Sequence, residues 1–246
     1  MKNIRLTLEY DGTRYQGWQH PGIKTPSDTI SGRIKSTLCR MTGEKIELFC
    51  AARTEPGVHA SCQTAGFLTS SPLSPQEIGR MLNQYLPQDI AVLRAEEAPE
   101  RFHASLNCLS QTYTYRVCTG TVPDVFRRKY MYHLPRTLDI PAMQKAASSL
   151  LGTHDFRCFS FGKTKKRSER EIRRAEIISP GEGEFCIVLE ASSFLRQMPR
   201  LIAGTLLETG LGLKKAECIP AILSGQEPAG APAPARGLCL TGTRYA

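Results

Sequence analysis

Hydrophobic and polar positions along the first hundred residues follow strand and helix periods in turn. A strict alternation of apolar with polar side chains, typical of a half-buried strand, occurs at Ile4, Leu6, Leu8 and Tyr10. Apolar residues then recur at helical spacing at Ile30, Ile34, Leu38 and Met41. Strand patterns follow over residues 46–50, 63–68 and 90–93, and Pro75 opens a second helix. The order predicts a β-α-β-β-α-β unit, the ferredoxin-like split pattern.

The second half of the chain repeats this theme with a different sequence. Residues 112–117 alternate as a strand, and Pro141 opens a helix with an apolar face. Further patterns predict two strands, a helix and a short closing strand, over residues 172–178, 185–189, 198–210 and 238–240. The fold class predicted is α/β (α+β): two ferredoxin-like (RRM-like) α/β units joined through mixed or antiparallel sheets, with a cleft between them. We expect an N-terminal domain over residues 1–104 and a C-terminal domain over residues 105–246.

Composition excludes several classes of protein. With 246 residues, of which 41% are hydrophobic and 22% charged, the chain can bury a substantial core. No run approaches the roughly eighteen apolar residues of a membrane span, and the N-terminus lacks the apolar core of a signal peptide, so we expect no membrane partner and a cytoplasmic location. The nine cysteines include no C-x-x-C pair and the five histidines lack ligand spacing, which argues against a disulfide framework and a metal site.

The chain carries an excess of cations. Lys and Arg total 32 against 23 Asp and Glu, and the resulting net charge of +9 is typical of proteins that bind polyanions. Basic residues gather at residues 127–129 and in a second, loop-like stretch that contains Lys163, Lys165, Lys166 and Arg167. Each cluster is either a solvated loop or a set of phosphate contacts, and the sequence leaves open which of them would contact a polyanion.

Residues 51–60 carry the densest chemistry of the chain. A cation, a hydroxyl, a carboxylate, a Pro-Gly turn and an imidazole follow the apolar run at residues 46–50. A strand followed by a turn presents reactive side chains at the edge of a sheet. Arg53 stands two residues before Glu55, so that one cation can keep the carboxylate ionised and oriented. Another cation, Arg200, stands at the start of an apolar helix face.

Several short segments of polar, aromatic and glycine residues occur in a fixed order along the chain. They are E-Y-D-G-T-R-Y-Q-G-W-Q at residues 9–19, R-T-E-P-G-V-H at residues 53–59, Phe102-His103-Ala104, Tyr113, His154-Asp155-Phe156, Met198 with Arg200, and Gly237-Leu238-Cys239-Leu240. In this order they resemble the motifs of the TruA family of tRNA pseudouridine synthases, and the resemblance covers nearly the whole chain.

The resemblance implies an activity and a partner. Members of this family isomerise uridine to pseudouridine in the anticodon stem-loop of tRNA, work as homodimers and use no metal or organic cofactor. A carboxylate acts at the sugar, the glycosidic bond breaks, the uracil rotates and a C–C bond forms. By this resemblance the chain would be an RNA-modifying isomerase with tRNA, or another structured RNA, as its partner. The uridine that it modifies is left open.

The resemblance also assigns roles to individual residues. The implied catalytic residues are Glu55, Arg200 and Tyr113. Arg200 would pair with the carboxylate and keep it ionised, and Tyr113 would stack on or hydrogen-bond the uracil. Arg53 would hold the base or backbone in its flipped position. The implied substrate-binding residues are Arg53, Thr54, His59, Arg14, Lys163, Lys165, Lys166 and Arg167.

The chain departs from the family pattern at the catalytic residue itself. The family's turn reads G-R-T-D-A-G-V-H, whereas this chain has Ala52, Glu55 and Pro56 in place of its first Gly, its Asp and its Ala. Glu adds one methylene, and a misplacement of ~1 Å can cost on the order of 10²-fold in rate. Two hypotheses stay open: an isomerase that uses Glu55, or a catalytically impaired paralogue that acts as a non-catalytic tRNA- or RNA-binding protein. A third, an α/β protein without a nucleic-acid partner, would leave Arg53, Glu55 and Arg200 unexplained.

Overall fold

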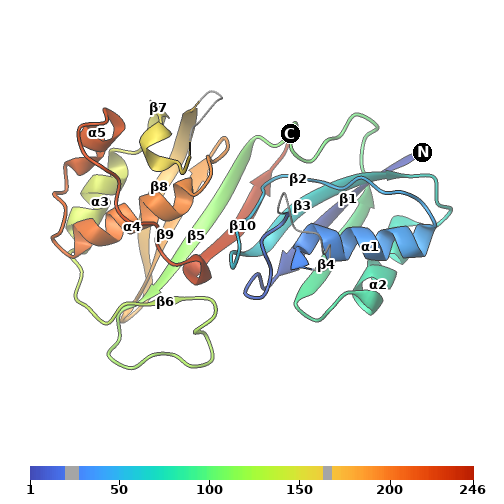
Figure 1. The fold of residues 1–246 in the computed structure, drawn as a ribbon, viewed down its shortest axis with the longest axis horizontal. Helices are drawn as coiled ribbons and strands as arrows, with labels where there is room; N and C mark the ends of the chain where they lie inside the picture. Colours follow the sequence, from blue (N-terminus) through green and yellow to red (C-terminus); the bar gives the residue numbers. More distant parts are fainter. Residues whose placement is uncertain (20–27, 163–167) are drawn as a thin grey trace. The chain divides into compact units, whose positions relative to one another are not determined.

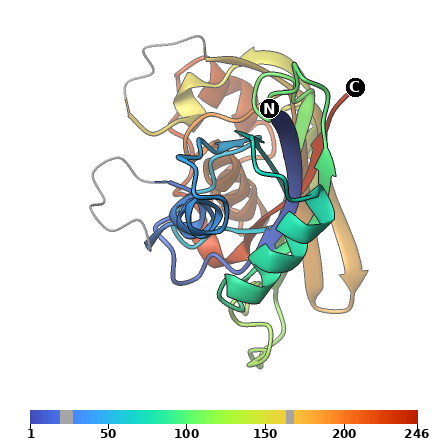
Figure 2. The ribbon, with the colours of Figure 1, turned by 90° about the vertical axis from the view of Figure 1, so that its right-hand side faces the viewer.

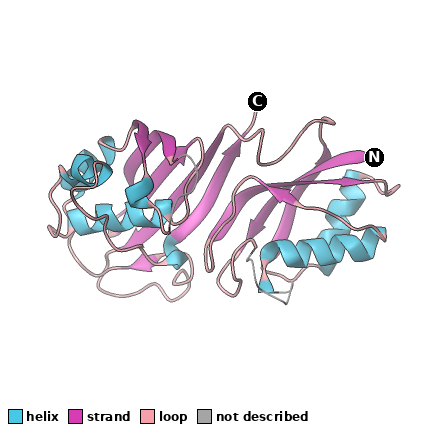
Figure 3. Ribbon diagram, turned by 45° about the horizontal axis from the view of Figure 1, so that its top comes forward, coloured by secondary structure: helices cyan, strands magenta, loops and turns pink. Residues whose placement is uncertain are grey.

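The computed structural model describes residues 1–19, 28–162 and 168–246, which form two compact units (Figure 1). Unit 1 comprises residues 1–109 and 240–246, and unit 2 comprises residues 110–239. The predicted α/β fold class is confirmed, because each unit combines antiparallel strands with helices that stand beside them (Figure 3). The domain boundary predicted at residue 104 stays a prediction, since compactness alone does not show that a part folds by itself.

Unit 1 has the β-α-β-β-α-β order that the periodicity predicts. Its elements are β1 (Lys2–Tyr10), α1 (Ile30–Thr42), β2 (Phe49–Cys50), β3 (His59–Thr69), α2 (Pro75–Tyr85) and β4 (Ile90–Glu97). Strand β1 lies between β3 and β4 and is antiparallel to both, while β2 pairs with β3. Helix α2 packs on β4 and against α1 (Figure 2). This is the strand order of a ferredoxin-like unit.

Strand β2 is shorter than the strand predicted over residues 46–50. Only Phe49 and Cys50 pair with β3, opposite Gly66 and Ala65. Ile46 is nevertheless buried, although it takes no part in the strand pairing. The apolar run therefore reports burial of the chain before the turn, and burial does not require a hydrogen-bonded ladder.

The last strand, β10 (Leu238–Arg244), begins in unit 2 and ends in unit 1. In unit 1 its end is anchored by the segment Phe102-His103-Ala104. The hydroxyl of Tyr245 donates to the carbonyl of Ala104 at 2.6 Å, and the Tyr245 ring centre lies 5.2 Å from that of Phe102. The Arg5 guanidinium stacks over both rings, 5.0 Å and 5.6 Å from their centres. This motif therefore serves to hold the closing strand against unit 1.

Unit 2 is built on antiparallel strands in the order β5-β9-β8-β7, with the short β6 parallel to β5. Its elements are β5 (Ser110–Cys118), β6 (Tyr132–His133), α3 (Ile140–Ser148), β7 (Gly152–Asp155), η2 (Arg157–Phe159), β8 (Glu169–Gly181), β9 (Glu184–Ala191), α4 (Met198–Gly210), α5 (Cys218–Leu223) and η3 (Ala235–Gly237). Helices α3 and α4 pack on each other, and α3 packs on β8. The sequence pattern missed β6, β7 and α5, because segments of two, four and six residues are too short to show a period.

Helix α4 carries Arg200 and is fastened to residues 231–233. The Arg200 Nε donates to the carbonyl of Ala233 at 2.8 Å, and the Ala233 N–H donates to the carbonyl of Arg200 at 3.0 Å. One turn further along α4, a Cβ at Gly204 would lie 1.7 Å from the carbonyl oxygen of Ala231. Only glycine allows this approach of two backbone segments, and the approach holds the Arg200 backbone in place.

Gly204→Ala is expected to destabilise the protein although alanine is the better helix former. Alanine gains about 1 kcal/mol over glycine inside a helix. A Cβ placed 1.7 Å from a backbone oxygen forces the chain apart, and overpacking costs about 1–3 kcal/mol or more. We therefore expect a net loss, seen as a fall in Tm of roughly 2–6 °C in thermal denaturation. Gly181→Ala is the matched control, because its Cβ would meet nothing within 4 Å. Equal Tm values for the two variants would contradict the packing argument.

Candidate active site

The residues of the predicted catalytic turn connect β2 to β3 in unit 1. Thr54 and His59 are buried, Glu55 is half-buried and Arg53 is exposed. Gly57 takes a φ of +75°, a left-handed conformation that glycine adopts without strain. The Glu55 side chain is therefore partly open to solvent. Its backbone lies between the buried Thr54 and the left-handed Gly57.

The opening segment, residues 11–18, packs directly against this turn. A Cβ at Gly12 would lie 1.9 Å from the carbonyl oxygen of Val58, and one at Gly17 would lie 2.5 Å from that of Thr54. Gly17 also takes a φ of +82°. The two most specific motifs of the sequence are thus one structural piece, and glycine is needed at both positions because backbone contacts backbone there.

The residue before the carboxylate, Thr54, is held by buried hydrogen bonds. Its hydroxyl lies 2.8 Å from the Tyr10 hydroxyl, and the Gln63 Nε2 lies 3.3 Å from that same Tyr10 oxygen. Gln63 also donates to the carbonyl of Ala52 at 2.6 Å, and the backbone N–H of Trp18 donates to the carbonyl of Thr54 at 2.9 Å. We call this the Tyr10–Thr54–Gln63 network. It fixes the backbone next to the carboxylate, because buried polar groups are costly to leave unpaired.

The sequence prediction missed Gln63 and Tyr10 as parts of the site. It treats Tyr10 as the last apolar position of a strand and Gln63 as the first residue of another. A signal was present, because a side-chain amide in a buried strand must find partners for its donors and its acceptor. Gln63 is fully buried; its amide donates to the Tyr10 hydroxyl and the Ala52 carbonyl and accepts from the Ala52 N–H.

His59 is buried at the start of β3, and its imidazole contacts the opening segment. The Nδ1 accepts a hydrogen bond from the Gly12 N–H at 3.1 Å and lies 3.3 Å from the Asp11 Oδ1. His59 thus holds the opening segment in place, and its substrate-binding role stays a prediction.

The cations near the turn have different surroundings. Arg53 is exposed. Burial raises the pKa of the Cys50 thiol to about 12, and the positive charge of Arg53 offsets part of that rise. Arg14 forms an ion pair with Asp89, and its guanidinium lies 5.5 Å from the ring centre of Tyr15. Hydrogen bonds to Tyr15 and Asp89 raise the pKa of Arg14. Both cations are solvent-accessible, and their contacts with substrate stay predictions.

In unit 2, Tyr113 and Arg200 lie on β5 and α4. Tyr113 is buried, and its ring meets that of Phe194 edge-on, with 5.2 Å between the ring centres. Arg200 stands in the first turn of α4, where the preceding Pro199 is tolerated because the first N–H groups of a helix have no intrahelical partner. Burial raises the pKa of Tyr115, and the positive charge of Arg200 offsets part of that rise.

The predicted site residues fall into three groups. Arg53, Thr54, Glu55 and His59 lie together on the turn of unit 1, and Arg14 belongs to the opening segment beside it. Tyr113 and Arg200 belong to unit 2, so the expected pair of Glu55 and Arg200 joins residues of the two units and stays a prediction. The remaining predicted substrate-binding residues lie outside the described residues; they are Lys163, Lys165, Lys166 and Arg167.

The described ranges offer neither a metal-binding cluster nor a membrane-spanning helix. Across residues 1–19, 28–162 and 168–246, no group of three or more His, Cys, Asp or Glu side chains is placed to hold a metal ion. Within the part of the chain that the structure describes, none of the helices combines the length and the apolar character that crossing a membrane requires.

Known proteins match this chain over most of its length. A family model described as tRNA pseudouridine synthase matches residues 7–106 and 146–246. The tRNA pseudouridine synthase A 2 of Bacillus cereus is 40% identical over 228 residues, which cover 92% of each chain. The tRNA pseudouridine synthase A of Moorella thermoacetica is 41% identical over 249 residues, covering 100% of each chain.

Among solved structures, the crystal structure of a Cbf5-Nop10-Gar1 complex is 12% identical, with 82% of this chain matched to 54% of that chain at a TM-score of 0.29. A likeness at that score has no bearing on the fold or the site. The family model and the Moorella thermoacetica relative, in contrast, span the opening segment, the Glu55 turn and the start of α4. The chain therefore belongs to the tRNA pseudouridine synthase family, as its motifs predict.

Proposed function

We propose that this protein converts uridine to pseudouridine in tRNA, with Glu55 as the catalytic carboxylate. The observation that carries this proposal is that backbone packing and buried hydrogen bonds both hold the Glu55 turn in place. The opening segment packs on it without intervening side chains, and the Tyr10–Thr54–Gln63 network holds the residue before the carboxylate. Catalytic groups need this kind of support, because a reacting atom has to be held to a fraction of an ångström.

The proposed reaction is an isomerisation and consumes no second substrate. The glycosidic C–N bond breaks, the uracil turns, and a C–C bond joins it to the same sugar. One proton leaves the carbon that forms the new bond, and one is taken up at the nitrogen that is released. The carboxylate of Glu55 would act at the sugar as a nucleophile or base. Arg200 would keep that carboxylate ionised, and Tyr113 would contact the uracil.

The longer side chain of Glu is accommodated, in this proposal, by the residues that follow it. Pro56 restricts the backbone of Glu55 to extended conformations, and Gly57 then reverses the chain with a φ of +75°. A backbone that is drawn back in this way would return the carboxylate of Glu55 to the position that the shorter Asp occupies in the family.

RNA is the partner that this reaction requires. The net charge of +9 favours a polyanion, and Arg53 and Arg14 belong to the same unit as the Glu55 turn. By the family resemblance, we further propose a homodimer that acts on tRNA in the cytoplasm. The basic stretch over residues 163–167 would add phosphate contacts.

The alternative function is that of a non-catalytic RNA-binding paralogue, and Glu in place of the family's Asp is the observation that favours it. This alternative requires that the protein bind tRNA and form no pseudouridine in it. A chemical map of pseudouridine after incubation with unmodified tRNA transcripts separates the two functions.

Glu55→Gln is expected to abolish pseudouridine formation while the fold and the affinity for tRNA persist. The substitution keeps the shape of the side chain and removes its charge, and the loss of a carboxylate in acid–base work lowers rates on the order of 10²–10⁴-fold. Pseudouridine formed per unit time in an unmodified tRNA transcript is the measurement. Glu47→Gln, at an exposed carboxylate before β2, is the matched control and should match the native rate. A Glu55→Gln enzyme as fast as this control would exclude Glu55 from catalysis.

Arg200→Gln and Glu55→Gln are expected to be non-additive in their effects on kcat. If the guanidinium acts by holding the carboxylate, little is left for its removal to change once the carboxylate is gone. The rates of the two single variants and of the double variant give the coupling. Arg200→Lys keeps the charge and loses the bond from Nε to Ala233, so it separates the effect of position from that of charge. Independent, fully additive effects would contradict the predicted pair.

Tyr10→Phe is expected to lower kcat more than it raises KM. It removes one buried oxygen and leaves the Thr54 hydroxyl and the Gln63 amide each short of a partner. We expect a loss of about 1–2 kcal/mol in the free energy of unfolding and a fall in kcat of about 10-fold or more from the loosened turn. Steady-state kinetics and urea denaturation check both values. Tyr85→Phe, at an exposed position on α2, serves as control; native kcat in Tyr10→Phe would exclude a positioning role.

A further inference from the structure

The loop between β5 and β6, residues 119–131, exposes an aromatic side chain that the fold does not use. Phe126 is 94% exposed, and Val122 and Val125 on the same loop are 77% and 60% exposed. We call this segment the Phe126 loop. It lies between the two stretches that match the family model.

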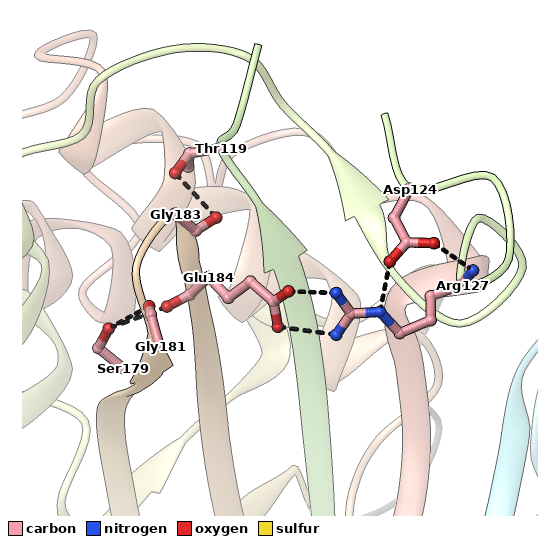
Figure 4. A network of polar contacts seen from close by, with 7 residues as sticks. All are labelled: Thr119, Asp124, Arg127, Ser179, Gly181, Gly183 and Glu184. Atoms are coloured by element: carbon pink, nitrogen blue, oxygen red, sulfur yellow. Dashed lines mark hydrogen bonds and ion pairs between the residues drawn. The ribbon is translucent and has the colours of Figure 1, made fainter. Parts of the chain in front are cut away.

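The residue after the exposed ring, Arg127, braces this loop (Figure 4). Its Nε donates to the Asp124 Oδ2 at 2.6 Å and its Nη1 donates to the Glu184 Oε2 at 3.0 Å, while its Nη2 bonds the other oxygen of Glu184. Nearby, the Thr119 N–H donates to the carbonyl of Gly183 at 2.7 Å. The loop is thereby tied to the turn between β8 and β9, and it presents the aromatic ring from a fixed base.

The brace sets the single positive charge of Arg127 against two carboxylates, those of Asp124 and Glu184. Hydrogen bonds to these carboxylates raise the pKa of Arg127. Arg128 and Lys129 follow directly, and both are exposed. Arg128 donates one of its several N–H groups to the carbonyl of Val125 at 2.6 Å. Because Arg128 and Lys129 are exposed at the surface of the loop, they are the candidates for phosphate contact.

We propose that Phe126 stacks on an unpaired base of the RNA substrate, with Arg128 and Lys129 contacting the adjoining phosphates. The proposal rests on the proposed function, because it takes RNA to be the partner. Every base has a π face, so an aromatic side chain next to cations binds single-stranded nucleotides with little regard for their sequence. A braced loop also loses less freedom when the ring is covered, which favours binding.

The size and the charge of the exposed surface favour a nucleotide over a protein partner. A phenylalanine side chain offers roughly 150–250 Å², and two valines add less, whereas a stable protein interface takes about 800 Å² from each partner. The acidic residue of the loop, Asp124, is already paired with Arg127. One base with its phosphates matches both the small apolar area and the positive charge.

Phe126→Trp provides a direct reporter of stacking. Trp18 is the only tryptophan of the chain and is fully buried, so the variant adds one exposed indole. Titration with an unmodified tRNA transcript is expected to quench the added fluorescence, since a stacked base contacts the whole ring. Leu213→Trp, at a position in unit 2 that is 72% exposed, is the matched control and should not be quenched. Equal quenching at the two positions, or none at position 126, would overturn the proposal.

Phe126→Ala and Phe126→Leu are both expected to weaken tRNA binding by about 5- to 150-fold, the range for the removal of one stacked base. Leu keeps apolar volume without a ring, so native affinity in Phe126→Leu would indicate an apolar interaction of another kind, such as one with a protein partner, and would overturn the proposal. Leu213→Ala should bind tRNA as the native protein does.

The double variant Arg128→Gln, Lys129→Gln should reduce the dependence of log Kd on log salt by about 0.7 for each phosphate that is no longer neutralised. Phe126→Ala should leave that slope unchanged.

Failure of this proposal can be distinguished from failure of the proposed function. If Phe126→Ala weakens tRNA binding while the native protein forms no pseudouridine, the isomerase assignment fails and the stacking interaction stands. If the native protein forms pseudouridine and Phe126→Ala has the same KM and Kd for tRNA, the stacking interaction fails and the isomerase assignment stands.

Discussion

Backbone packed on backbone around the Glu55 turn is the constraint on which the candidate site depends. Gly12 and Gly17 approach the carbonyls of Val58 and Thr54 so closely that no side chain fits between them. The position of the turn is therefore set by steric exclusion, which varies more steeply with distance than attraction does. Hydrogen bonds then select one arrangement within this narrow space, through the buried Tyr10–Thr54–Gln63 network. The backbone that carries the Glu55 carboxylate is therefore fixed, and only the torsions of the side chain itself can adjust.

The long elements could be predicted from the sequence because each one buries a single face over several periods. Strand β1 and helices α1 and α4 have the alternating or helical patterns that reveal such a face. Elements that are fixed by a neighbour left no such trace. Strand β2 exists only where two residues pair with β3, and β6 only where two residues pair with β5. Their positions follow from the partner strand, which a local pattern does not contain.

The candidate site divides in the same way. The turn could be identified from its sequence because a cation, a carboxylate and an imidazole stand close together along the chain. The partners of Gln63 and of Arg127 could not be identified in this way, because Tyr10 and Glu184 are distant from them in sequence. Arg127 looks like part of a basic cluster beside Arg128 and Lys129, yet its guanidinium binds Glu184, which lies 57 residues away. Charge along the sequence therefore overstates the cations that are available to an anionic ligand, because some of them are paired through the fold.

The path of β10 has a consequence for how the protein is made. Unit 1 contains residues 1–109, but it also needs residues 240–246, which lie beside β3 and bring Tyr245 onto Phe102. During translation, all of unit 2 must leave the ribosome before this last strand is available. Until then β3, the strand that begins at His59, pairs with β1 on one side and only with the two residues of β2 on the other. The rest of that edge is open and can mispair with other nascent chains. Of the two units, the one that carries Glu55 is thus the first to begin its synthesis and the last to be completed.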